Sequence, residues 1–164
     1  MISLSSKILN DCFINIGSGI YQEHITKYLK KKKLFVISTD KNSKAKALKF
    51  ADEKIILGSF DHDKIYEKIL KIKKKNKINI KGVITGCTRG AIYTTSFLAK
   101  KFKVPALNLV SAKIISNKKN FLKKFNSKLI FKKFNLNKLS KSSFPIVIKD
   151  DKFSGAEGVR MVKD

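Results

Sequence analysis

Short apolar runs recur at fairly even intervals along the first two thirds of the chain, and segments of helical period separate them. Each run is rich in Ile, Val or Leu and has the length of a buried strand. Strand–helix alternation repeated this often implies parallel strands joined by right-handed crossovers. The five runs span residues 13–16, 34–38, 54–57, 82–85 and 106–110. We therefore expect a doubly wound α/β domain with a five-stranded parallel sheet over residues 1–112.

The alternation stops near residue 110, and the remainder of the chain has a different character. Residues 111–125 have a helical pattern, and residues 128–134 have a strand pattern. Further on, an apolar run led by Pro145 and a second run over residues 159–162 flank a loop that contains glycine, which predicts a β-hairpin. We expect these elements to begin a second, α+β domain over residues 113–164 that is incomplete within this chain.

The chain carries a formal net charge of +25, which by itself favours a polyanionic partner. However, only two of its 37 basic residues are arginines, Arg89 and Arg160. Arginine has the planar guanidinium that makes bidentate phosphate and base contacts, and lysine does not. We therefore expect solvated lysines rather than a nucleic-acid surface, and a non-catalytic polyanion-binding module remains an alternative.

The two cysteines, Cys12 and Cys87, lie far apart and outside any metal-ligand spacing, so neither a disulfide framework nor a zinc site is predicted. The longest apolar runs are too short to cross a bilayer, and the first residues lack the apolar core of a signal peptide. These features predict a cytoplasmic protein without a membrane partner.

A glycine turn, Gly17-Ser18-Gly19, follows the first predicted strand and opens the first predicted helix. Glycines at this point allow a tight turn and let an anion approach the helix N-terminus. Asp40 closes the second strand, where a dinucleotide enzyme places its ribose-binding acid. The fingerprint is incomplete, because Gln22 stands in place of its third glycine. An NAD(P)-binding or other nucleotide-binding oxidoreductase or epimerase domain therefore remains an alternative, and the turn is a candidate substrate-binding site.

A second polar loop, residues 86–90, follows the fourth predicted strand and carries Arg89. Ligands of open α/β sheets bind beyond the carboxyl ends of the strands, where this loop and the glycine turn both lie. The guanidinium of Arg89 is suited to hold a carboxylate or a phosphate. We therefore count Arg89 among the candidate substrate-binding residues.

Lys149 ends the apolar strand of the predicted hairpin, at a position expected to be half-buried. A lysine there needs a partner, and a nucleotide phosphate is one candidate. Ser154, Gly155 and Gly158 follow in the loop and offer backbone N–H donors to the same phosphates. A simple hairpin turn with a solvated lysine explains the same residues equally well.

The order of these motifs resembles the ATP-grasp superfamily, in particular its carboxylate–amine ligase, biotin-carboxylase-like and carbamoyl-phosphate-synthase-like branches. Asn117-Lys118 resembles the family's Asn/Asp-Lys at the head of a helix, and residues 144–149 resemble its aromatic–Pro–apolar–Lys strand. Residues 154–159 resemble its glycine-rich loop. The loop has fewer Gly and Ser residues than the family pattern, and Asp150 stands where the family usually has Pro.

The resemblance implies a Rossmann-like pre-ATP-grasp domain followed by the start of an ATP-grasp domain. Enzymes of this family use ATP and Mg²⁺ to activate a carboxylate as an acyl phosphate, which an amine or another nucleophile then attacks. By resemblance, Lys118 and Lys149 contact the nucleotide. Ser154, Gly155 and Gly158 belong to the loop that closes over its phosphates.

The family's metal ligands lie after the glycine loop, so we expect no metal ligand and no catalytic residue within residues 1–164. We accordingly expect an N-terminal fragment of a ligase that is inactive alone. The expected partners are ATP and a small carboxylate, whose identity the resemblance leaves open, and a homodimer is compatible with it.

Overall fold

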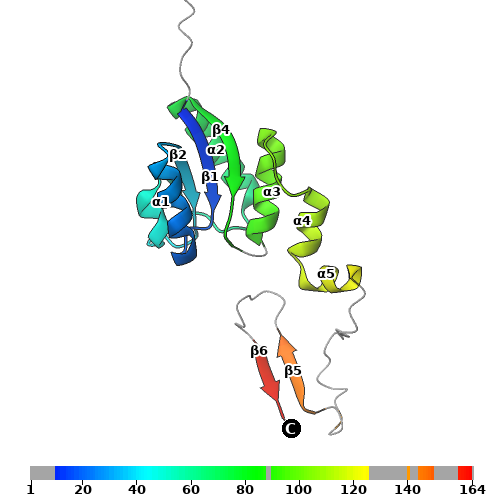
Figure 1. Ribbon diagram of the computed structural model, residues 1–164. Helices are drawn as coiled ribbons and strands as arrows, with labels where there is room; N and C mark the ends of the chain where they lie inside the picture. The colour runs from blue at the N-terminus through cyan, green and yellow to red at the C-terminus, as the bar shows by residue number, and fades with distance from the viewer. Residues whose placement is uncertain (1–9, 88–89, 126–139, 141–143, 150–158, 164) are drawn as a thin grey trace, which may run out of the picture. The chain divides into compact units, whose positions relative to one another are not determined.

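The computed structural model describes residues 10–87, 90–125, 140, 144–149 and 159–163 of the 164-residue chain (Figure 1). The chain separates into two compact units, Met1–Lys113 and Ile114–Asp164. Each unit has its own secondary structure, so each is described by itself.

The first unit is built on a parallel sheet of four strands in the order β3-β2-β1-β4. Its strands are β1 (Asn10–Ile16), β2 (Phe35–Thr39), β3 (Glu53–Ile55) and β4 (Ile78–Ile84). Its α-helices are α1 (Glu23–Lys31), α2 (His62–Asn76), α3 (Gly90–Phe102) and α4 (Leu109–Ile115), the last of which ends in the second unit. Two short 3₁₀ helices, η1 (Ile20–Gln22) and η2 (Lys46–Phe50), follow β1 and β2.

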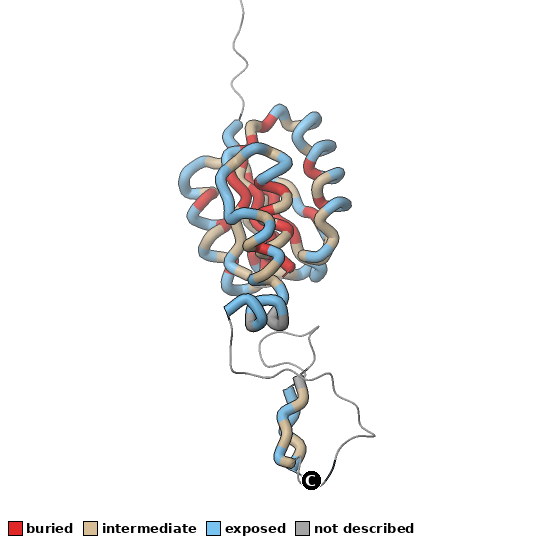
Figure 2. The backbone as a smooth tube through the Cα atoms, turned by 90° about the vertical axis from the view of Figure 1, so that its right-hand side faces the viewer, coloured by how far each residue is buried: buried red, intermediate tan, exposed pale blue. Residues whose placement is uncertain are grey.

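The core lies between the sheet and the pair α2 and α3, and the buried strands run through the centre of Figure 2. Alternate side chains of β1, among them Ile14, point into this core, because successive strand residues face opposite sides of a sheet. Ile65 and Ile69, one helical turn apart on α2, and Leu98 on α3 cover the sheet there. On the opposite face the side chain of Asn15 reaches α1.

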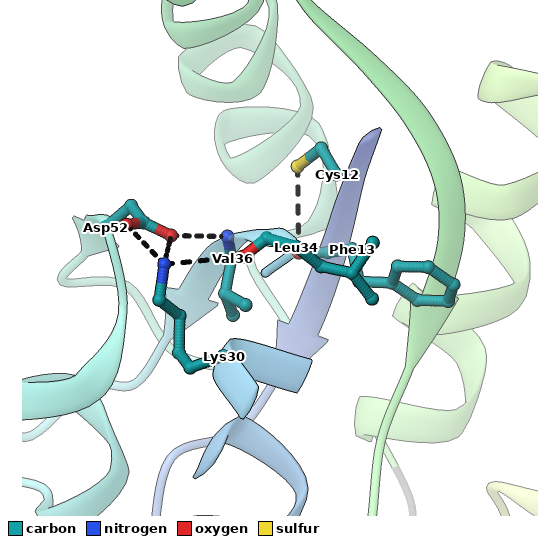
Figure 3. A network of polar contacts seen from close by, with 6 residues as sticks. All are labelled: Cys12, Phe13, Lys30, Leu34, Val36 and Asp52. Atoms are coloured by element: carbon teal, nitrogen blue, oxygen red, sulfur yellow. Dashed lines mark hydrogen bonds and ion pairs between the residues drawn. The ribbon is translucent and has the colours of Figure 1, made fainter. Parts of the chain in front are cut away.

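Cys12 of β1 is fully buried in the same core, and its Sγ lies 3.7 Å from the carbonyl oxygen of Phe13 (Figure 3). Burial raises the pKa of this thiol to about 12. Cys12 therefore stays protonated and packs as a small apolar side chain.

A polar network joins the end of α1 to the start of β3 across β2 (Figure 3). Lys30 Nζ lies 2.6 and 2.7 Å from the two carboxylate oxygens of Asp52 and donates to the carbonyl oxygen of Leu34 at 3.3 Å. The same carboxylate accepts the backbone N–H of Val36 at 2.7 Å, and Asp52 N–H donates to the carbonyl oxygen of Val36 at 2.9 Å. Asp52 thereby completes the hydrogen bonding of β2 one residue before β3 begins.

The parallel α/β class predicted from the sequence is confirmed, but the prediction of a fifth strand is wrong. Residues 106–108 are irregular, and residues 109–110 open helix α4. The segment follows Pro105, which has no backbone N–H to give to a sheet, and four of its five residues are exposed. Residues 106–110 are apolar but are not buried in the fold, so the burial that stabilises a central strand is missing here.

The predicted helix over residues 111–125 is present as two helices, α4 and α5 (Lys118–Lys124). Asn117 separates them with extended backbone angles, φ −123° and ψ 113°, and its side chain accepts the backbone N–H of Asn120 at 3.0 Å. This is an N-cap, which starts a new helix by satisfying one of its free N–H groups.

The second unit contains the predicted β-hairpin, which is confirmed. Strands β5 (Ile146–Lys149) and β6 (Val159–Val162) pair antiparallel, with Ile146 opposite Val162 and Lys149 opposite Val159. The predicted strand over residues 128–134 lies outside the described residues.

The Asp52 network predicts different costs for two substitutions of the same residue. Asp52→Ala removes the acceptor of the buried Val36 N–H, so the free energy of unfolding should fall by about 1–3 kcal/mol. Asp52→Asn keeps an acceptor oxygen and loses only the partly exposed ion pair with Lys30, which should cost about 0–1 kcal/mol. Urea unfolding followed by circular dichroism measures both values.

Lys30→Ala is the matched control, because it removes the ion pair and leaves the Asp52 carboxylate on Val36. Lys30→Ala also removes the 3.3 Å hydrogen bond to the Leu34 carbonyl oxygen, so its cost should lie between those of Asp52→Asn and Asp52→Ala. Equal losses for Asp52→Ala and Lys30→Ala would contradict the role given to the Val36 hydrogen bond.

Candidate functional site

The loops that follow β1, β2 and β4 meet at the carboxyl edge of the sheet, where the arrowheads of β1 and β4 end in Figure 1. They contribute Gly17-Ser18-Gly19, Asp40 and Gly86-Cys87. Because all four strands are parallel, these loops share one edge, which is the usual ligand site of an open α/β sheet. The structure therefore brings together the described site residues that the sequence predicted in this unit.

Gly17 turns the chain at the end of β1 with a φ of +86°, a backbone region that favours glycine. A β-carbon at this position would collide with Sγ of Cys87, which comes from the loop after β4. Glycine is therefore required both by the backbone angle and by the close approach of the neighbouring loop.

Ser18 is completely buried and is bonded on three sides within the protein. Its backbone N–H donates to Oδ2 of Asp40 at 2.8 Å, and its hydroxyl donates to the carbonyl oxygen of Thr39 at 3.0 Å. Its own carbonyl oxygen accepts the N–H of Ala47 at 2.9 Å. These bonds tie the glycine turn to the end of β2 and to η2.

Asp40 uses both carboxylate oxygens on backbone amides. Oδ2 accepts from Ser18, and Oδ1 accepts the N–H of Asn42 at 2.9 Å. Each oxygen keeps a second lone pair, and the two bonds that are present hold backbone rather than a ligand. The geometry accounts for Asp40 as the residue that fixes two loops.

The loop after β4 is fixed by Thr85, whose hydroxyl donates to the carbonyl oxygen of Ile16 at 2.7 Å and accepts the N–H of Cys87 at 2.9 Å. Burial raises the pKa of the Cys87 thiol. A thiol in this state is a poor nucleophile and fits the packing contact with Gly17. Arg89, the candidate anion-binding residue of this loop, lies outside the described residues.

The loop between β3 and α2 adds an exposed aromatic ring that the sequence analysis did not single out. Phe60 is 70% exposed, and its ring lies so close to Gly90 at the start of α3 that a β-carbon there would sit 2.6 Å from it. Thr94 Oγ1 donates to the carbonyl oxygen of Ser59 at 2.6 Å, and Gly58 N–H donates to Asp61 at 2.9 Å. In the sequence, only the position of Phe60 between the turn-forming residues Gly58-Ser59 and Asp61 pointed to an exposed aromatic ring.

The predicted phosphate-binding residues lie in the second unit. Lys118 is the first residue of α5, and Lys149 is the last residue of β5, opposite Val159. Their side chains are outside the described part of the structure, as are residues Ser154, Gly155 and Gly158. Lys149 and Val159 form the last residue pair of the two strands, so Lys149 lies at the loop end of the hairpin.

Within the described ranges, no three His, Cys, Asp or Glu side chains are grouped so that they could hold a metal ion. The described helices likewise include none that is long and apolar enough to cross a membrane.

The turn geometry predicts a coupling between Gly17 and Cys87. Gly17→Ala should lower the free energy of unfolding by the cost of a left-handed alanine, about 1–2 kcal/mol, and by the overlap with Sγ, about 1–3 kcal/mol. Cys87→Ala removes the sulfur, so the double variant should recover the free energy lost to the overlap with Sγ. A double-mutant cycle measured by urea unfolding should give a favourable coupling of at least about 1 kcal/mol.

Cys87→Ala alone supplies the baseline for this cycle. Strictly additive losses in the double variant would mean that the two residues do not contact each other in solution.

Residues 14–94 match the family described as the PylC-like N-terminal domain. Among solved structures, N5-carboxyaminoimidazole ribonucleotide synthetase from Thermotoga maritima is 26% identical, with a TM-score of 0.54 over 95% of this chain and 41% of that chain. L-amino acid ligase from Bacillus licheniformis is 20% identical, with a TM-score of 0.64 over 96% of this chain and 40% of that one. No curated protein matches the chain.

N5-carboxyaminoimidazole synthetase from Staphylococcus aureus, complexed with ADP, is 14% identical, with a TM-score of 0.65 over 95% of this chain and 42% of that chain. The chain thus spans about two fifths of the length of these three solved relatives. The resemblance to the N-terminal portion of ATP-grasp enzymes is confirmed, and the match to the PylC-like N-terminal domain covers just under half of this chain.

Proposed function

We propose that this chain supplies the N-terminal part of an ATP-dependent carboxylate–amine ligase, or a ligase of related C–N chemistry, that acts through an acyl phosphate. One observation carries the proposal: a four-stranded parallel domain is followed in order by a capped helix that starts at Lys118 and by a hairpin that places Lys149 at its loop end. The L-amino acid ligase match over 96% of this chain supports the same order of parts.

The strand pairing of the hairpin supports a phosphate clamp at its loop. Because Lys149 and Val159 are paired, the two ends of the loop that connects them are adjacent. Lys149 therefore stands at the base of the loop that carries Ser154, Gly155 and Gly158. We propose that the lysine side chain and the loop N–H groups share one set of phosphate oxygens.

The proposed chemistry begins when a carboxylate oxygen of the substrate attacks the γ-phosphorus of ATP, and ADP leaves with the electrons of the broken bond. The amine then adds to the acyl carbon and expels phosphate. The contribution of Lys118 and Lys149 would be electrostatic, since they would offset negative charge on the transferring phosphoryl group. Magnesium, when bound, supplies further positive charge, and we assign it no ligand among the described residues.

We propose that the carboxylate substrate binds at the carboxyl edge of the sheet, by way of Gly17, Ser18, Gly19 and Arg89. Ser18 would act indirectly, because its N–H and hydroxyl are bonded to Asp40 and Thr39. Its part would be to hold the turn in shape beside the substrate. The chain spans only about two fifths of the length of the solved relatives, so we propose that turnover requires more than these 164 residues.

The proposed clamp predicts that Lys149→Ala abolishes most ATP turnover in the gene product that contains this chain. Loss of one charged group that stabilises the transferring phosphoryl group should lower kcat/KM for ATP by roughly 100-fold or more. ADP release with increasing concentrations of small carboxylates measures the effect, and thermal unfolding should be unchanged.

Lys163→Ala is the control, since Lys163 is exposed and follows β6 in the same hairpin. It removes an equal charge and should keep near-normal turnover. Equal activity in the Lys149 and Lys163 variants would refute the role proposed for Lys149.

A further inference from the structure

A concave pocket of about 360 Å³ lies in the first unit, between the start of α1, the segment that leads into η2, and β3. Four lysines from two segments line it, together with one hydroxyl and one carboxylate: Lys44, Lys46, Lys49, Lys54, Ser43 and Glu23. We call it the η2 pocket. None of its residues belongs to the nucleotide clamp proposed above.

The charge in the η2 pocket is strongly unbalanced. Glu23 is the only carboxylate in its wall, and Lys27 already pairs with it at 2.7 Å. The hydrogen bond from Lys27, with the nearby lysine charges, lowers the pKa of Glu23, so that it stays ionised on Lys27. Among the described residues, none of the four lining lysines forms an ion pair.

The backbone that carries these lysines is held in place from both sides. Lys44 N–H donates to Oδ1 of Asn42 at 3.0 Å, and Ala47 N–H donates to the carbonyl oxygen of Ser18 at 2.9 Å. Ala47 and Leu48 are buried, and η2 packs chiefly against α1. The backbone from which Lys44, Lys46 and Lys49 extend is therefore held in place.

Two lysine ammonium groups beside the pocket contact the aromatic ring of Phe50. Lys49 Nζ lies 4.8 Å from the centre of the Phe50 ring, and Lys27 Nζ lies 4.7 Å from the same centre. Cation–π contacts of this kind hold an ammonium group near a fixed position at a small energetic gain. Of these two lysines only Lys49 lines the pocket, where its charge adds to the field of the other three lining lysines.

We propose that the η2 pocket binds a compact multivalent oxyanion of the diphosphate type. Such an anion offers several acceptor oxygens within a few ångströms and offsets the mutual repulsion of the four ammonium groups. The pocket is large enough to admit a small anion, whereas a nucleic acid requires a basic stripe along an extended surface. The binding goes beyond the proposed ligase function and does not depend on it.

The test titrates inorganic pyrophosphate into the 164-residue chain at low salt, by calorimetry and by amide chemical shifts. We expect saturable binding with the largest shifts over residues 43–49, both in the unchanged chain and in Lys149→Ala, which removes the proposed clamp. Lys46→Ala/Lys54→Ala should weaken binding by roughly tenfold or more, which corresponds to the loss of two charged contacts. Should that variant melt at a lower temperature, Lys46→Gln/Lys54→Gln replaces it with longer polar side chains.

Lys73→Ala/Lys74→Ala is the matched control, since it removes the same charge from the last turn of α2, away from the pocket. It should change the affinity less than about twofold. Equal weakening in both double variants, shifts spread over all lysine-bearing surfaces, or no saturation would overturn the proposal. Preferential binding of a single-stranded oligonucleotide over pyrophosphate would overturn it in favour of a polyanion surface. A failure of the Lys149 experiment leaves these outcomes unchanged, so the two proposals fail separately.

Discussion

The left-handed turn at Gly17 is the constraint on which the carboxyl edge of the first unit depends. It brings the end of β1 against the Cys87 thiol, and it lets the next residue, Ser18, bond to the end of β2. One glycine thus connects the loops of three adjacent strands. A side chain at this position would have to adopt a left-handed conformation and would overlap with the Cys87 sulfur, so the contact between the loops after β1 and β4 would have to shift.

The sequence predicted the buried strands well, because apolar runs and burial coincide in β1, β2 and β4. It failed where an apolar run is not buried: residues 106–110 follow Pro105, remain largely exposed and form no strand. The helical pattern over residues 111–125 did not show the break at Asn117, whereas the resemblance of Asn117-Lys118 to the head of a helix did, and α5 begins there with Asn117 as its N-cap. Local pattern predicts an element, and burial against the rest of the fold decides whether it forms.

The candidate site was only partly predictable, because its bonds join residues far apart in the chain. That Gly17 and Asp40 would share an edge followed from parallel strands, but the bond from Ser18 to Asp40 did not. The η2 pocket was invisible for another reason. Lysines occur throughout this sequence, and only the fold shows that four of them surround one concavity with a single, already paired carboxylate.

The functional account depends on where nucleotide phosphates bind, and a crystal structure of the gene product containing this chain with ADP tests it most directly. The account predicts phosphate oxygens within hydrogen-bond distance of Lys149 Nζ and of the N–H groups of residues 154–158. Phosphates bound instead at Gly17-Ser18-Gly19, with the ribose on Asp40, would contradict it and would indicate a dinucleotide-binding domain.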